Sequence, residues 1–408
     1  MDKNVIVGQS GGPTAVINAT LAGVYQAAER RGAKKIYGMC HGIEGFINDD
    51  YVDLGEKISG QVEIELLKRT PSSYLGSCRF KLPSVTEDEA LYVKLFEKLE
   101  KLNIGYFFYI GGNDSMDTIM KLSDYASTIG SDIRFIGVPK TIDNDLAVTD
   151  HTPGYGSAAK YIAVVMKELV RDATVYGTNY VTIVEIMGRN AGWLTAAASL
   201  ANGPDCEGVD MICLPEYPFN VENFIAKVER MQKDKKSIII AVSEGVKVAD
   251  GRYVCELSDD ARFVDSFGHT SLSGTAHYLA NRVANALDTK TRAIELSTLQ
   301  RCASHMTSRT DITEAFQVGG AAVKAAFEGQ TGKMVSLVRL SNDPYQCTTE
   351  LCDIHKVANF EKKVPLDWLN SDHTRMTKEF LDYARPLIQA ELSPIYIDGL
   401  PQHICIDK

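Results

Sequence analysis

The sequence of 408 residues has no apolar run of about 18 residues, the length that a membrane-spanning helix requires. Its N-terminus also lacks the basic stretch and the long apolar run of a secretory signal peptide, and its first apolar residues are typical of a short strand instead. These two absences predict a protein without membrane association and, by default, a cytoplasmic one.

Cysteine pairs at metal-binding spacing are missing as well. The nine cysteines are scattered and form no CxxC pair, which disfavours a zinc site or a dithiol redox centre. We expect reduced, mostly buried thiols, as in a reducing compartment.

Positive charge is scarce. Lys and Arg number 43 against 53 Asp and Glu, so the formal net charge is −10. Such a surface does not attract nucleic acid or anionic membrane, and we expect neither as a partner. If the ligand is an anion, the cations that hold it must be concentrated at one place.

Short apolar runs alternate with amphipathic stretches, which is typical of α/β proteins. The runs predict strands at Asn4–Gly8, Lys35–Met39, Gly105–Ile110, Ile133–Val138, Tyr180–Ile186, Met211–Leu214, Ser237–Val242 and Ala293–Leu296. Apolar residues at three- and four-residue spacing predict helices at Pro13–Arg31, Glu87–Leu102, Ser115–Thr128, Ser157–Ala173, Ala191–Ala201, Val221–Gln232, Leu272–Leu287, Ile312–Phe327 and Thr377–Leu392.

Several predicted strands end in glycine or polar residues just before a helix, and ligands of open parallel sheets bind beyond such ends. The first end has the sequence GQSGGP at residues 8–13. Its glycines would let a phosphate approach the backbone, and Pro13 suits the first position of a helix whose N-terminus binds anions. A plain glycine-rich turn explains the same residues equally well. The segment also fits a G-x-S-x-G nucleophile elbow with Ser10, although that elbow usually follows several strands rather than one.

The next two ends carry acidic and basic residues. In GGNDS, at residues 111–115, Asp114 is either a helix N-cap or a carboxylate that repels any further phosphate at a helix terminus. In PKTIDND, at residues 139–145, Asp143 is suited to take a proton from a hydroxyl group and Lys140 to neutralise a phosphoryl group. A solvated turn capped by Asx residues is the alternative for the second segment.

Three later positions add candidate ligands for a phosphorylated sugar. Arg189 follows one strand and is suited to clamp a phosphate or hydroxyl group, and Glu244 follows another and is suited to sugar hydroxyls. Arg292 and Arg301 flank the predicted strand at Ala293–Leu296 and are suited to bind a phosphate. Surface ion pairs are the alternative for each.

Taken in this order and spacing, GGNDS, PKTIDND and MGRNAG resemble the 6-phosphofructokinase family, over roughly Asn4 to Gly329. The resemblance implies two similar Rossmann-like α/β/α domains of three layers, with the active site in the cleft between them. It implies a donor-binding domain at residues 1–140, completed by about 302–340, and a fructose 6-phosphate-binding domain at 141–301. Residues 341–408 would form a C-terminal extension with at least one helix.

The resemblance also implies roles for single residues. Asp143 matches the catalytic base, Thr141 lines the fructose 1-hydroxyl, and Arg79 matches an arginine near the transferred group. Gly11 matches the glycine at the donor phosphates. The sugar and its 6-phosphate would be held by Met187, Gly188, Arg189, Glu244, Arg292 and Arg301, one of these arginines often reaching across from a neighbouring subunit.

Asp114 and Lys140 indicate the donor. Members of the family that use ATP have glycine at both positions, whereas members that use pyrophosphate have Asp and Lys, as this chain does. Asp114 would put charge where the α-phosphate of ATP must lie, and repulsion in a partly desolvated site costs a few kcal/mol. Lys140 would stabilise the bridging charge of pyrophosphate as it splits.

Three residues depart from the family pattern. Asn113 replaces the aspartate that usually faces the metal. Its amide oxygen can still ligate Mg²⁺ but brings no charge. Asp145 or the pyrophosphate would then supply more of the negative charge around the metal. Thr298 replaces a histidine or tyrosine near the 6-phosphate, and Tyr180 replaces an arginine.

The predicted reaction is a reversible, Mg²⁺-dependent transfer from pyrophosphate to the 1-hydroxyl of fructose 6-phosphate, giving fructose 1,6-bisphosphate and phosphate in glycolysis. An ATP-dependent 6-phosphofructokinase of the same fold is one alternative. A catalytically silent regulatory subunit that only binds sugar phosphate is another. The family precedent implies a homodimer or homotetramer.

Overall fold

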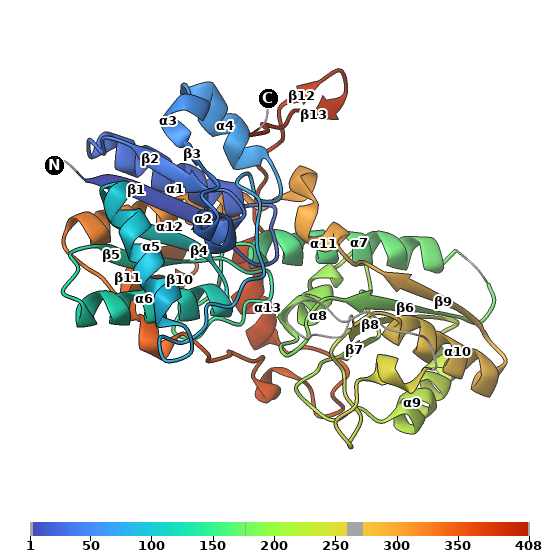
Figure 1. Ribbon diagram of the computed structural model, residues 1–408. Coiled ribbons are helices and arrows are strands. Elements are labelled where there is room, and N and C mark those ends of the chain that lie inside the picture. The colour runs from blue at the N-terminus through green and yellow to red at the C-terminus, as the bar shows by residue number, and fades with distance from the viewer. Residues whose placement is uncertain (1–2, 176, 259–271, 407–408) are drawn as a thin grey trace.

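The computed structural model describes residues 3–175, 177–258 and 272–406, which form two α/β lobes (Figure 1). Each lobe has its own mainly parallel sheet with helices on both faces. The predicted α/β class and its two three-layer domains are therefore confirmed. None of the helices in the described ranges is long and apolar enough to cross a membrane.

The larger lobe is built on a seven-stranded sheet in the order β11-β10-β5-β4-β1-β2-β3. Its central strands are parallel, and β3 and β11 pair antiparallel at the two edges. The strands are β1 (Asn4–Gln9), β2 (Ile36–Met39), β3 (Tyr51–Asp53), β4 (Ile104–Gly111), β5 (Arg134–Pro139), β10 (Lys333–Asn342) and β11 (Tyr345–Asp353). Its helices are α1 (Ile17–Arg30), α2 (Gly42–Ile47), α3 (Leu54–Lys57), α4 (Gln61–Arg69), α5 (Glu89–Lys101), α6 (Asn113–Thr128) and α12 (Arg309–Phe327).

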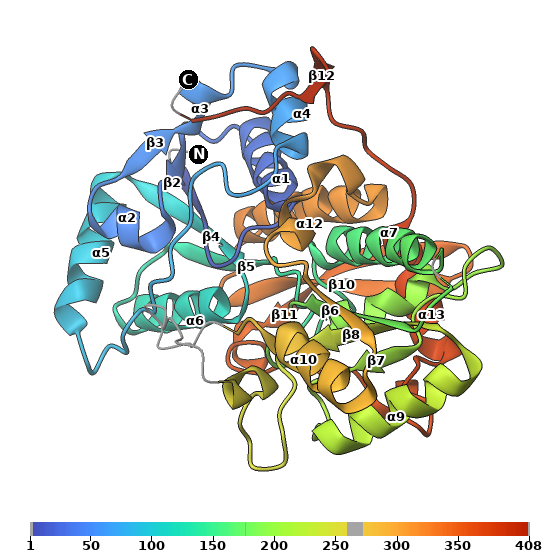
Figure 2. The same cartoon turned by 90° about the vertical axis from the view of Figure 1, so that its right-hand side faces the viewer.

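Alternate residues of the central strands supply two cores, one on each face of this sheet. On β4, Phe108 and Ile110 pack toward α1 and α12, whereas Phe107 and Tyr109 pack toward α5 and α6. Figure 2 shows α1 and α12 together on one side of the strands and α5 and α6 on the other. Because both faces are covered, these strands appear in the sequence as continuous apolar runs.

The smaller lobe has a four-stranded parallel sheet in the order β7-β8-β6-β9. Its strands are β6 (Tyr180–Ile186), β7 (Met211–Cys213), β8 (Ser237–Ser243) and β9 (Lys290–Glu295). Its helices are α7 (Tyr155–Ala173), α8 (Trp193–Ala197), α9 (Val221–Asp234), α10 (Thr275–Leu287) and α11 (Leu299–Cys302). Helices α7 and α8 cover one face of the sheet, and α9 and α10 cover the other.

The chain after residue 340 belongs to both lobes. The larger sheet continues through β10 and β11, past the predicted boundary at 340. The following segment contains α13 (Lys378–Ala384), and its apolar residues join the core between α7, α8 and the smaller sheet. A short hairpin of β12 (Tyr396–Ile397) and β13 (Leu400–Pro401) projects beside α4 (Figure 1).

Several predicted helices are shorter than expected; the one at Ala191–Ala201, for example, is α8 followed by a 3₁₀ turn at Ala198–Ala201. Two others begin late or end early for clear local reasons. The first begins at Ile17 rather than Pro13, because the carbonyl of Thr14 accepts from the backbone N–H of Ser72 (3.1 Å) instead of from a helical neighbour. The predicted helix at Thr377–Leu392 is α13 followed by a 3₁₀ turn at Arg385–Ile388. Pro386 lies in that turn and has no N–H with which to extend an α-helix.

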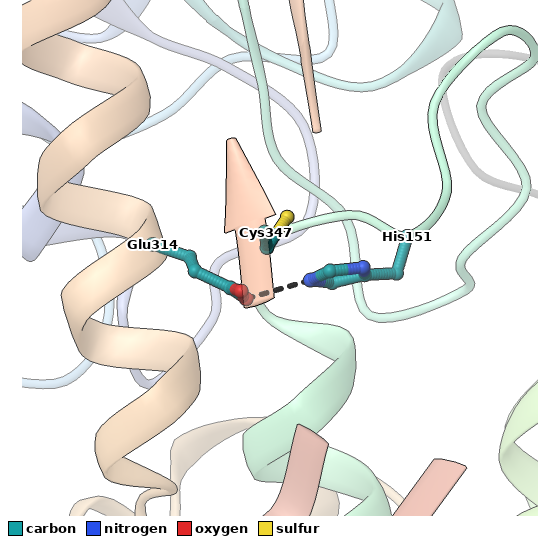
Figure 3. A group of neighbouring side chains, drawn as sticks. All are labelled: His151, Glu314 and Cys347. Carbon is teal, nitrogen blue, oxygen red and sulfur yellow. Dashed lines mark hydrogen bonds and ion pairs between the residues drawn. The ribbon is translucent and has the colours of Figure 1, made fainter. Parts of the chain in front are cut away.

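A buried histidine, His151, fastens the segment between β5 and α7 to the larger lobe. Both ring nitrogens of His151 contact carboxylates, Nδ1 that of Asp150 (2.7 Å) and Nε2 that of Glu314 (2.6 Å). The second oxygen of Glu314 accepts from the hydroxyl of Tyr345 (2.6 Å), and Cys347 lies beside them (Figure 3). The potential ligand atoms of His151, Glu314 and Cys347 lie within 4.8 Å of one another. Because both ring nitrogens already have carboxylate partners, we interpret this group as a protonated clamp rather than a metal centre.

Six of the nine cysteines are buried, so the prediction of mostly buried thiols is confirmed. Their reduced state stays a prediction.

Candidate active site

A cavity of about 420 Å³ lies between the two lobes, beyond the carboxyl ends of β1, β4, β5, β6 and β8. The sequence predicted a site at these strand ends, and most of the predicted residues meet here. Those that line the cavity are Gly11, Arg79, Asn113, Asp114, Lys140, Thr141, Asp143, Met187, Arg189, Glu244 and Arg301.

The glycines after β1 let two cationic side chains approach the backbone. A Cβ on Gly11, whose φ is +74°, would lie 3.4 Å from Nζ of Lys140. A Cβ on Gly12 would lie 3.3 Å from a guanidinium nitrogen of Arg301. The anion-binding character of this loop therefore comes from Lys140 and Arg301, because α1 begins only at Ile17 and its N-terminus is not at the glycines.

Lys140 is the most deeply buried cation of the cavity, with 2% of its surface exposed. Its ammonium group donates to the carbonyl of Gly12 (2.6 Å). Burial lowers its pKa to about 8, although Asp143 opposes this shift. Lys140 is therefore a mostly charged group at neutral pH that has already lost its water shell.

Asp143 lies on the same side of the cavity as Lys140. The hydroxyl of Thr141 donates to its carboxylate (3.3 Å) and accepts from its backbone N–H (3.1 Å). Burial raises the pKa of Asp143, while Thr141 and Lys140 act against the rise. A carboxylate whose pKa is raised in this way is a stronger base toward a hydroxyl group than a solvated one.

Asp114 lines the cavity from the first turn of α6 and is exposed to it. The alternative that Asp114 caps this helix is wrong. The cap position is occupied by Gly112, and no side-chain cap bond forms there.

The smaller lobe contributes the residues predicted to hold the sugar. Glu244 accepts from the backbone N–H of Gly188 (3.3 Å), and Gln300 accepts from that of Met187 (3.2 Å). Burial raises the pKa of Glu244 to about 8, assisted by Asp143. Gly188 has a φ of +139°, and a Cβ there would lie 2.6 Å from the carbonyl oxygen of Ala191. Gly188 thus shapes the wall without itself lining the cavity.

The cavity concentrates positive charge. Burial lowers the pKa of Arg301, and the neighbouring charge of Arg79 lowers it further. The three guanidinium groups of Arg79, Arg189 and Arg301 and the ammonium group of Lys140 around one volume form an anion site in a chain of net charge −10.

Besides Gly188, two predicted ligands lie outside the cavity lining. Arg292 is half exposed on the edge strand β9, where its guanidinium lies 3.7 Å from the carboxylate of Asp172 and 5.6 Å from the ring centre of Tyr180. Thr298 precedes α11. Their predicted roles toward the 6-phosphate stay predictions.

The structure adds residues that the motifs did not indicate. Asn190 and Glu361 line the cavity, and the amide of Asn190 donates to the carboxylate of Glu361 (2.8 Å). Asn190 lies inside the MGRNAG motif, so its neighbours could have pointed to it. Nothing around Glu361 in the sequence marks it as part of a site.

Ser10, the serine that fits a nucleophile elbow, also lines the cavity. Among the described residues of the cavity wall there is no histidine to act as its base. The nucleophile elbow is therefore not supported.

The fold and this cavity define a class of protein: a two-lobed α/β enzyme with a cleft for phosphorylated ligands. A family model described as Phosphofructokinase matches residues 4–326, and the chain belongs to the phosphofructokinase family.

Relatives across nearly the whole length carry a more specific name. The chain is 42% identical over 407 residues to a pyrophosphate–fructose 6-phosphate 1-phosphotransferase of Xanthomonas campestris pv. campestris, covering 99% of this chain and 96% of the relative. It is 38% identical over 409 residues to an enzyme of the same name from Methylococcus capsulatus, covering 99% and 96%. The crystal structure of a pyrophosphate-dependent phosphofructokinase from Nitrosospira multiformis superposes with a TM-score of 0.89, at 38% identity and with 98% and 96% coverage.

The donor atoms of the cavity fit Mg²⁺, which enzymes of this family generally use. Oδ1 of Asn113 is buried and has no hydrogen-bond partner within the described ranges. The carboxylates of Asp143, Asp145 and Glu361 line the same cavity. Oxygen donors of this kind are those that Mg²⁺ prefers.

Proposed function

We propose that this chain transfers a phosphoryl group from pyrophosphate to the 1-hydroxyl of fructose 6-phosphate. The single observation that carries the choice of donor is the pairing of Lys140 with Asp114 in one cavity. Lys140 lies against the glycine loop, and Asp114 faces the same volume. The names of the relatives at 38–42% identity support the same donor.

In the forward reaction, Asp143 accepts the proton of the sugar 1-hydroxyl. The oxygen then bonds to one phosphorus of pyrophosphate, the bond from that phosphorus to the bridging oxygen breaks, and orthophosphate leaves with the bond electrons. Lys140, Arg79 and the backbone of Gly11 stabilise the charge on the transferring group and the leaving phosphate. Arg79 lines the cavity close enough to Arg301 to depress its pKa.

The sugar is placed against Asp143 by the smaller lobe. Glu244 and the Met187–Arg189 backbone would bind its hydroxyls, and Arg301 its 6-phosphate. Since Glu244 and Asp143 face the same cavity, one sugar can contact both.

A bound Mg²⁺ ion would neutralise pyrophosphate oxygens during the transfer. Asn113 and Asp145 would hold it, because the oxygen of Asn113 is buried without a partner and Asp145 lies in the same wall.

The two alternatives are less well supported. A silent regulatory subunit has no need of a buried base beside a buried lysine, and this chain retains both. An ATP-dependent enzyme would have to place its α-phosphate beside the carboxylate of Asp114.

For the assembly, we propose a homodimer or homotetramer in which a second copy brings Arg292 to the 6-phosphate. Half the side chain of Arg292 is exposed on an edge strand, away from the cavity of its own chain.

A donor comparison tests the proposed reaction. Purified protein is assayed with fructose 6-phosphate and Mg²⁺, with either pyrophosphate or ATP. We expect turnover with pyrophosphate and little with ATP. Efficient turnover with ATP would favour the first alternative, and turnover with neither donor would favour the silent subunit.

A further inference from the structure

Glu361 reaches the active-site cavity from a part of the chain that the family model does not include. The model matches residues 4–326, and Glu361 lies beyond it, between β11 and α13. Its side chain lines the cavity together with Asp143 and Asp145. The cavity is therefore completed by the C-terminal extension.

The position of Glu361 is fixed by backbone contacts with both sides of the cleft. Glu361 forms a β-bridge with Leu146, and the N–H of Lys362 donates to the carbonyl of Asp145 (2.7 Å). On the other side, the indole N–H of Trp193 donates to the carbonyl of Lys362 (2.9 Å). These bonds hold the backbone of Glu361 directly beside the PKTIDND segment.

The ammonium group of Lys362 strengthens the same attachment. It donates to the carbonyls of Thr149 (3.1 Å) and Asp150 (2.7 Å) and lies 5.2 Å from the ring centre of Trp193. The side chain of Glu361 is held by Asn190, which occupies one of its two carboxylate oxygens. Glu361 is itself exposed, so these contacts rather than burial hold it at the cavity.

The surroundings of Glu361 carry an excess of negative charge. Asp143, Asp145 and Glu361 all line the cavity, and the backbone of Glu361 and Lys362 pairs with that of Leu146 and Asp145. A cation bound among three carboxylates offsets their mutual repulsion. Asn113 lines the same cavity and supplies a buried oxygen with no charge.

We propose that Glu361 provides the cation site with the negative charge that Asn113 lacks, so that the C-terminal extension is part of the site for the metal–pyrophosphate complex. The inference rests on the proposed function for the identity of the anion. The cation site itself does not depend on which phosphate donor is used.

The test is Mn²⁺ binding, followed by electron paramagnetic resonance at constant ionic strength. The titration is made with Mn²⁺ alone and with Mn²⁺ plus methylenediphosphonate, a pyrophosphate analogue that does not hydrolyse. Glu361→Gln keeps an oxygen for Asn190 and removes only the charge. We expect it to weaken Mn²⁺ binding by about three- to tenfold, the size of one charge interaction at short range in a partly solvated site.

A charge-relocation variant makes the test specific. Asn113→Asp in the Glu361→Gln background should restore Mn²⁺ affinity to within about twofold of the wild type. Glu379→Gln is the matched control, because Glu379 is an exposed glutamate of the same extension outside the cavity lining. It should leave Mn²⁺ affinity unchanged.

Unchanged Mn²⁺ affinity in Glu361→Gln overturns the inference, as does a double variant that stays as weak as the single one. Should Glu361→Gln fail to fold, Glu361→Asp decides instead, because it keeps the charge but shortens the side chain and should also weaken Mn²⁺ binding if Glu361 faces the cation. A failure of the proposed function would give another result: the wild type would bind Mn²⁺ with the same affinity in the presence and absence of methylenediphosphonate.

Discussion

At the scale of single residues, the site depends on charges that are held without water. Lys140 is buried and Asp143 is partly buried, and each shifts the pKa of the other toward its charged form. The sequence predicted both residues and their roles, because they belong to one motif. It could not predict that the Gly11–Gly12 loop rather than a helix N-terminus would be the partner of Lys140, since this depends on the backbone of Thr14 bonding to Ser72.

Replacing Asp143 by Asn should remove the base and leave the fold intact. We expect kcat to fall by about 10³-fold, within the range for general base catalysis. The thermal midpoint should stay equal or rise, because Asp143 is buried among other carboxylates. Steady-state kinetics and calorimetry on the same sample measure both. A variant that keeps most of its kcat would exclude Asp143 as the base.

The pH profile of kcat/KM should report Lys140 on its basic side. The charged form is the active one, and its pKa in the free enzyme is about 8, so activity should fall as pH rises through 8. In Lys140→Arg the side chain cannot lose its proton in this range, and the basic limb should move upward even if the maximum is lower. If kcat/KM of Lys140→Arg falls at the same pH as that of the wild type, the loss of activity must be caused by another group.

At the scale of elements, most strands and helices of the two sheets follow from apolar periodicity alone. Strand β6 has the predicted bounds, β1 differs from them by one residue at its end, and β4 and β5 differ by one residue at each end. The strands β10 and β11 were not predicted, because β11 is an edge strand whose residues are mostly half-buried or exposed and carry no continuous apolar run. The clamp of His151 was missed for a related reason: its partners are brought together only by the packing of α12 and β11 against the hinge.

The His151 clamp should stabilise the fold in a pH-dependent way. Burial lowers the pKa of His151, but Glu314 and Asp150 outweigh this and raise it to about 9, above 6.5 for a free histidine. Because the folded form holds the proton more tightly, the stabilisation is complete below pH 6.5 and is lost as pH rises toward 9. Urea denaturation of the wild type and of His151→Gln should show a difference of a few kcal/mol at pH 6 that shrinks by pH 9.5.

The difference between the two proteins is the quantity to follow. Other groups with raised or lowered pKa values, such as Glu244 and Lys362, contribute to both proteins equally. A difference that stays constant from pH 6 to pH 9.5 would show that His151 is not a charged clamp.

At the scale of the whole molecule, the C-terminal extension joins the two lobes and finishes the active site. The resemblance to the family ended near Gly329, and the sequence beyond it shows no motif, so its role could not be predicted. In the structure Phe380, Tyr383 and Leu387 are part of the core of the smaller lobe. The extension is thus needed for folding as well as for the cavity.

Phe380→Ala should therefore destabilise the protein strongly. Phe380 is fully buried, and truncation of such a side chain costs about 3–5 kcal/mol. Chemical denaturation measures the loss, with Phe360→Ala as the control, because Phe360 is 56% exposed on the same extension. Equal stability of the two variants would mean that the extension only covers the lobe.

The central claim is that Asp114 and Lys140 together select pyrophosphate, and the most direct test measures kcat/KM for both donors in the wild type and in Asp114→Gly/Lys140→Gly. The account predicts that the wild type prefers pyrophosphate, and that the double variant loses pyrophosphate activity by about a hundredfold or more while ATP turnover appears or improves. A double variant with the same preference between the two donors as the wild type would contradict it.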